Sequence, residues 1–312
     1  MIGLPGHEKA KEFLVSIIKK YDPKGSGVLK VSNIAPNTEE IKAFYQNDFD
    51  QKIAGKFPNG SPEYIRWKRF TDSMKAFAEK KKTVNVQNID WEKKGLNSKK
   101  VLVVTAHYDT ISHHKENLTV NETEKMPGAN YNASGVVVAL GLIKTLAKID
   151  LNYTVKVVFL DYQGLGFHGA TVLADELTAS GNEVMGIVNL EMLGQDTSYL
   201  DSTKQLGNMS LYTRENSLEK KFAGALVEKG SQLTKKVNFE IRPDGFESSD
   251  NFRFWEKGFL SVTFSQNWEE DFNPKFYQNP QDTPETLNHD TLYASYQYLG
   301  GAVIGTLLDL TK

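Results

Sequence analysis

The sequence has no cysteine among its 312 residues, which excludes disulfide bonds and thiolate metal ligands. A metal centre would therefore have to use histidine and carboxylate side chains. No apolar run approaches the ~20 residues that are needed to cross a bilayer, so no membrane span is predicted. The formal net charge is only −2, and no basic pattern indicates nucleic acid as a partner.

A signal peptide is also missing from residues 1–7, which have neither a basic start nor an apolar core. The lack of cysteine is compatible with an exported bacterial protein. We therefore expect a periplasmic or extracellular location, with any leader already removed.

The hydrophobic pattern alternates between strand-like and helix-like segments along the whole chain. Two examples are the strand-like runs Val101–Thr105 and Thr154–Leu160, with a mostly apolar helical run at 136–146 between them. Such alternation is typical of a mainly parallel sheet covered by helices. We predict one α/β domain over residues 1–312, in three layers, with a mixed and mostly parallel sheet and helices on both faces.

Residues 38–82 form an extra helical stretch, predicted to be an insertion or a cap over a pocket. Its aromatic stripe keeps helical spacing and is expected to pack against the sheet rather than to form a ligand cage. After it, Thr83–Ile89 alternates like a strand, and Trp91–Lys100 is predicted to be a turn-rich connection.

Polar clusters follow the two strand-like runs. His107-Tyr-Asp109 follows the first, and Asp161-Tyr-Gln163-Gly164 follows the second. Between them, a segment containing Asn130 and Asn132 opens a helix. Because sites in open α/β sheets form at the carboxyl ends of strands, these three loops are predicted to converge on one pocket.

Several motifs in order resemble those of the co-catalytic zinc aminopeptidases. This group includes bacterial leucyl aminopeptidase, aminopeptidase Y, the glutamate carboxypeptidase type and the one-zinc glutaminyl cyclases. The resemblance runs from the first helix to the last. The motifs are Ala106-His-Tyr-Asp-Thr110, Pro127-Gly-Ala-x-x-Asn-Ala-Ser-Gly135, Asn189-Leu-x-Met-x-Gly194, Ser249-Asp250 before Gly258, and Tyr277 with Asp282-Thr-Pro-x-Thr-Leu-Asn288.

The resemblance implies hydrolysis of a terminal peptide bond by two zinc ions, which activate a bridging water, and by a glutamate general base. It also implies a set of His and carboxylate ligands. Two residues keep the family's pattern: His107 as a ligand and Asp109 as the carboxylate behind it. Glu191 replaces an aspartate and keeps its charge.

The other positions implied by the resemblance have changed. The bridging carboxylate falls on Tyr131, the base on Gln163, and a glutamate ligand on Gly164. The last histidine falls on Gln278, and that of the Ser-Asp-His motif on Asn251. An amide keeps the size of a carboxylate but is a poor zinc ligand and no base at neutral pH.

These changes predict a metal-free pocket without the family's chemistry. We expect Asn130, Asn132, Asp161, Tyr162 and Tyr277 to line it and a peptide or a protein N-terminus to bind there. For Asp161 a structural role is also favoured.

Two other hypotheses stay open. One is an active zinc aminopeptidase with a shifted ligand set drawn from His107, Asp109, Glu191, His113, His114 or His168, although His113 and His114 are expected in a solvated loop. The other is a one-zinc cyclase-like transferase, for which the matching Asp and His are missing.

Overall fold

The computed structural model describes residues 1–196, 208–269 and 275–309. Its α-helices are α1 (Pro5–Tyr21), α2 (Thr38–Phe49), α3 (Pro62–Lys80), α4 (Ser134–Leu146), α5 (His168–Ala179), α6 (Ser217–Gly230), α7 (Asn251–Glu256) and α8 (His289–Leu307). Short helical turns are η1 (Asp50–Ala54), η2 (Ala129–Ala133) and η4 (Pro284–Thr286). The strands are β1 (Val28–Ile34), β2 (Val86–Lys93), β3 (Asn97–His107), β4 (Tyr153–Leu160), β5 (Glu183–Leu190), β6 (Asn208–Tyr212), β7 (Asn238–Arg242) and β8 (Ser261–Gln266).

The strands form one mixed sheet in the order β1-β2-β4-β3-β5-β8-β6-β7. Its central strands β4, β3, β5 and β8 are parallel, whereas β2 pairs with β4 and β6 pairs with β8 in antiparallel fashion. The predicted α/β fold with a mixed, mostly parallel sheet is confirmed.

The predicted strand at 83–89 was misplaced. β2 begins at Val86 and continues to Lys93, so the turn-rich connection expected from Trp91 is short. Trp91 stays in the strand because its ring is buried, it pairs with Val157 of β4, and its Nε1 donates to Asp22 Oδ2 at 2.9 Å.

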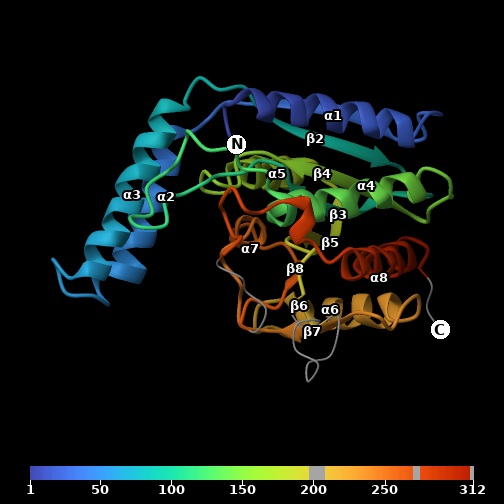
Figure 1. Ribbon diagram of the computed structural model, residues 1–312. Helices are drawn as coiled ribbons and strands as arrows, with labels where there is room; N and C mark the ends of the chain where they lie inside the picture. The colour runs from blue at the N-terminus through green and yellow to red at the C-terminus, as the bar shows by residue number, and fades with distance from the viewer. Residues whose placement is uncertain (197–207, 270–274, 310–312) are drawn as a thin grey trace.

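Helices cover both faces of the sheet (Figure 1). Alternate residues of β3 point to opposite faces, so Leu102 and Val104 pack in the core with α1, α4, α6 and α8, and Val101 and Val103 pack with α5 and α7. A strand that is buried on both faces reads as a continuous apolar run, as the sequence shows here.

Helices α2 and α3 lie side by side beyond one end of the sheet (Figure 1). Two edge-to-face ring contacts hold them together: Tyr45 with Phe70, at 5.9 Å between centroids, and Phe49 with Tyr64, at 5.2 Å. Whether they are an insertion in the family fold stays a prediction.

Across the described ranges, no helix combines the length and the apolar character that a membrane crossing requires.

Candidate functional site

Three parallel strands bring the predicted loops to one edge of the sheet. β3 ends at His107, β4 ends three residues before Gln163, and β5 ends one residue before Glu191. The turn η2, before α4, lies at this edge, where Asn132 Nδ2 donates to Leu190 O at 2.9 Å. The sheet topology therefore gathers residues that are far apart in the sequence.

His107 is fully buried between carboxylates. Its Nε2 lies 3.5 Å from Glu191 Oε1, and its Nδ1 lies 3.1 Å from the Asp109 carbonyl oxygen. Burial lowers the pKa of His107, but the carboxylates of Glu191, Asp109 and Asp250 outweigh it and raise the pKa to about 9. The carboxylates therefore favour the protonated form of the imidazole.

The carboxylates around His107 are themselves buried. Ser249 Oγ donates to Glu191 Oε2 and accepts from Asn189 Nδ2 at 2.7 Å. Neither carboxylate oxygen of Asp250 has a hydrogen-bond partner in the part of the chain that the structure describes, and burial raises the pKa of Asp250 well above its usual value. We call His107, Asp109, Glu191 and Asp250 the buried polar cluster.

Tyr131 covers this cluster with its ring. The side chain is 1% exposed, and its ring lies edge-to-face on His107, with 4.9 Å between the centroids. Its hydroxyl donates to Gln163 Oε1 at 2.5 Å. Burial raises the pKa of the phenol well above its ordinary value, so the hydroxyl stays neutral and acts as a donor. The peptide bond that joins Tyr131 to Asn132 is cis.

A side chain at Gly164, which the family pattern asks for, would crowd Ile111. A Cβ atom placed on it would lie 3.1 Å from Cγ2 and 3.2 Å from Cβ of Ile111. Ile111 is 1% exposed and packs in the apolar cluster beside α2 and α3. An apolar side chain therefore fills the space next to this position.

Two carboxylates hold the surrounding backbone in place. Asp109 accepts the N–H groups of Gln163 and Gly164, each at 3.0 Å. Asp282 accepts those of Asn130 at 2.8 Å and Tyr131 at 2.9 Å. These bonds fix the loops whether or not a metal is present.

Four residues predicted to line the pocket are instead buried beneath it: Asn130, Asn132, Asp161 and Tyr162. The two asparagines accept backbone N–H groups from the chain after β5. Asp161 pairs with Nε2 of His7 at 2.7 Å and accepts from the Tyr108 hydroxyl at 2.8 Å, which is a structural role. Its partner His7 was missed because it lies 154 residues away and carries no motif.

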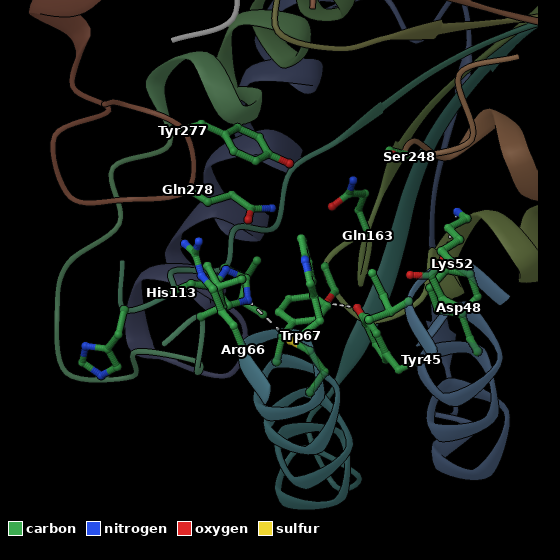
Figure 2. Close-up of a pocket in the computed structure, with 18 of the residues that line it drawn as sticks. Tyr45, Asp48, Lys52, Arg66, Trp67, His113, Gln163, Ser248, Tyr277 and Gln278 are labelled. Atoms are coloured by element: carbon green, nitrogen blue, oxygen red, sulfur yellow. Dashed lines mark hydrogen bonds and ion pairs between the residues drawn. The ribbon is translucent and has the colours of Figure 1, made fainter. Parts of the chain in front are cut away.

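A cavity of about 840 Å³ opens on the outer side of Tyr131. Its inner wall is formed by Tyr131, Gln163, Gly164, Tyr277 and Gln278. Side chains of α2 and α3 form much of the facing wall (Figure 2). The site therefore combines the strand ends with the extra helical stretch at 38–82.

The expectation that the aromatic stripe of α3 packs against the sheet is wrong for part of it. Trp67, Phe70 and Met74 line the cavity, and Trp67 is 38% exposed. The reason is that α3 lies beyond the strand ends, so its apolar side meets α2 and the cavity. Phe77 does pack inward, in the cluster with Val86.

His113 also departs from expectation, because it is half-buried and packs on an aromatic ring. Its ring centroid lies 5.4 Å from that of Phe70, and it lines the cavity. Burial lowers the pKa of His113 to about 4, so it is neutral at pH 7. His114 is exposed as predicted, and His168 lies 3.0 Å from Ala35 O before α2, so neither joins His107.

The residues at the implied ligand positions do not fit a two-zinc centre. His107 and Glu191 keep metal-binding chemistry, whereas a neutral phenol, a glycine and an amide occupy the others. Within residues 1–196, 208–269 and 275–309, no group of three His, Cys, Asp or Glu side chains is placed to hold a metal ion.

Comparison with known proteins places this arrangement in a family. The model for peptidase family M28 matches residues 88–302, which cover all of the strand ends described above. The chain belongs to this family. The predicted resemblance is therefore confirmed.

Among similar proteins, aminopeptidase YwaD of Bacillus subtilis is 26% identical over 244 residues, which cover 76% of this chain and 47% of that protein. A probable zinc metalloprotease of Pyrenophora tritici-repentis is 32% identical over 98 residues, 31% of this chain and 20% of that protein. The chain thus spans less than half the length of either relative.

One solved structure shows the same fold over nearly the whole chain. The aminopeptidase from Aneurinibacillus sp. strain AM-1 has a TM-score of 0.64 and 16% identity, covering 98% of this chain and 89% of that one.

Proposed function

We propose that this chain is an M28 protein that binds a peptide or a protein N-terminus in its cavity without hydrolysing it and without zinc. The observation that carries the proposal is the hydrogen bond from the Tyr131 hydroxyl to Gln163 Oε1. It joins the two positions where the family has a bridging carboxylate and a general base.

The chemistry of this pair supports a binding role. A neutral phenol that donates to a neutral amide supplies neither a negative charge for a dication nor a base for water. Protonated His107 among carboxylates compensates part of the negative charge that a metal would otherwise balance. A cavity of about 840 Å³ remains available, which is within the size range of small-ligand sites.

Hydrolysis of leucyl-4-nitroanilide after dialysis against zinc tests the proposal. We expect no release above the rate of the buffer. Zinc-dependent release that disappears in His107→Ala would contradict the proposal and favour an active metallo-aminopeptidase.

A further inference from the structure

The charges around the cavity are unevenly distributed, and this distribution indicates which end of a ligand enters first. The inner wall carries only neutral groups: the Tyr131 phenol, the amides of Gln163 and Gln278, and the Tyr277 hydroxyl. The carboxylates of Asp109 and Glu191 lie behind this wall and do not line the cavity. A free α-ammonium group would find no counter-charge there.

Hydrogen-bonding capacity is nevertheless present on the inner wall. Gln163 lines the cavity and uses its Oε1 to accept from Tyr131, so the Nε2 of that amide is its remaining donor group. Amide donors of this kind suit a carbonyl oxygen or another uncharged acceptor. The inner end of the ligand is therefore neutral and polar.

The acidic side chains of the cavity share one lysine. Asp48 and Glu247 both face Lys52, whose Nζ lies 2.8 Å from Asp48 Oδ1 and 3.6 Å from Glu247 Oε2. Asp48 and Lys52 lie on the α2 side of the cavity (Figure 2). Lys52 compensates one of the two negative charges, so this group attracts a cation less than two unpaired carboxylates would.

The remaining basic side chains of the cavity bond to neutral groups. Arg66 Nη2 donates to Lys115 O at 3.2 Å, Lys115 Nζ lies 3.5 Å from Lys275 O, and Lys56 lies over the Phe57 ring. None of these contacts cancels a positive charge. Arg66 sits on α3 next to Trp67, so a cation and an aromatic face adjoin on the same wall (Figure 2).

We propose that the cavity takes a short apolar peptide with a blocked amino end and a free carboxylate, with the blocked end at Gln163 and the carboxylate at Arg66. The apolar side chains lie against Trp67, Phe70 and Met74. This inference rests on the proposed function and reverses the charge preference that a free peptide N-terminus would require. A guanidinium pairs with a carboxylate through two parallel hydrogen bonds, which makes Arg66 the specific contact.

Three probes separate the two ends of the ligand in calorimetric titrations of the full chain. They are N-acetyl-leucyl-phenylalanine, its C-terminal amide, and leucyl-phenylalanine amide with a free amino group. We expect the first to bind about fivefold more tightly than its amide, because an exposed ion pair contributes modestly. Leucyl-phenylalanine amide, with its free amino group, should bind most weakly.

The matched variants are Arg66→Gln and Arg69→Gln, two identical changes on α3, of which only the first touches the cavity. Arg66→Gln should lower the affinity for N-acetyl-leucyl-phenylalanine to that for the amide and leave the amide unaffected. Arg69→Gln should change neither value. Equal effects of both variants would overturn the role of Arg66.

Preference for leucyl-phenylalanine amide, or no binding of any probe, would overturn the ligand class itself. If leucyl-phenylalanine amide binds best but is recovered intact, only this inference fails. If it is cleaved in the presence of zinc, the proposed function fails as well.

Discussion

The buried polar cluster and the cavity lie on the two sides of Tyr131, and they differ in where charge is found. The cluster concentrates a histidine and carboxylates where water does not reach. The cavity is open, but its inner wall is neutral. The charged groups buried behind Tyr131 can stabilise the loops but cannot contact a ligand. The buried polar cluster and the cavity therefore have separate roles.

Loss of Asp109 should show the largest effect on the cluster side. Asp109→Ala removes a buried carboxylate that accepts two backbone N–H groups and faces His107, so we expect the free energy of unfolding to fall by about 3 kcal/mol. Urea denaturation measures it. Asp72→Ala, at an exposed i,i+4 pair on α3, is the control and should cost far less. A similar loss of stability in both variants would mean that Asp109 does not hold the loop at Gln163 and Gly164 in place.

Placing a carboxylate at position 164, between the buried polar cluster and the cavity, should lower the free energy of unfolding somewhat less. Gly164→Glu forces Ile111 to move, so a loss of about 2 kcal/mol in the free energy of unfolding is expected. The additional cost of Gly164→Glu should shrink in an Ile111→Ala background, as a double-mutant cycle would show.

The control for that cycle is Gly224→Glu in α6, where nothing lies within 4 Å of the added Cβ atom. It should not destabilise the protein. A free energy of unfolding that is unchanged by Gly164→Glu would show that the space at this position is not filled.

The smallest effect is expected on the cavity side, at His113. Its pKa is about 4 in the folded protein and about 6.5 in an unfolded chain, so between these values the unfolded state binds more protons. Stability therefore falls as the pH falls from 6.5 towards 4, by on the order of 1 kcal/mol over the first pH unit and by more below it. His113→Gln should flatten this slope in thermal melts, whereas the exposed neighbour His114→Gln should preserve it. A slope that persists in His113→Gln would contradict the burial of this ring.

The sheet could be predicted from the sequence because the alternation of apolar segments is a local feature. The polar residues at the strand ends could be predicted because they belong to short motifs in a fixed order. Tyr131 and Gln163 could be named in advance as replacements, but their mutual hydrogen bond could not, since it joins residues 32 positions apart. The contact of Ile111 with Gly164 could not be predicted either, because Ile111 belongs to none of the motifs.

The α3 side chains in the cavity were also missed. A helical stripe looks the same whether it faces a sheet or an open space, and only the position of α3 beyond the strand ends decides between them.

The stoichiometry of zinc tests the proposed loss of the metal centre most directly. The protein would be purified without chelator, dialysed against excess zinc and then against buffer, and analysed by inductively coupled plasma mass spectrometry. A neutral phenol at the bridging position and a glycine beside Ile111 predict far less than one zinc per chain. One or two zinc ions retained per chain, and lost in His107→Ala, would contradict the proposed loss of the metal centre.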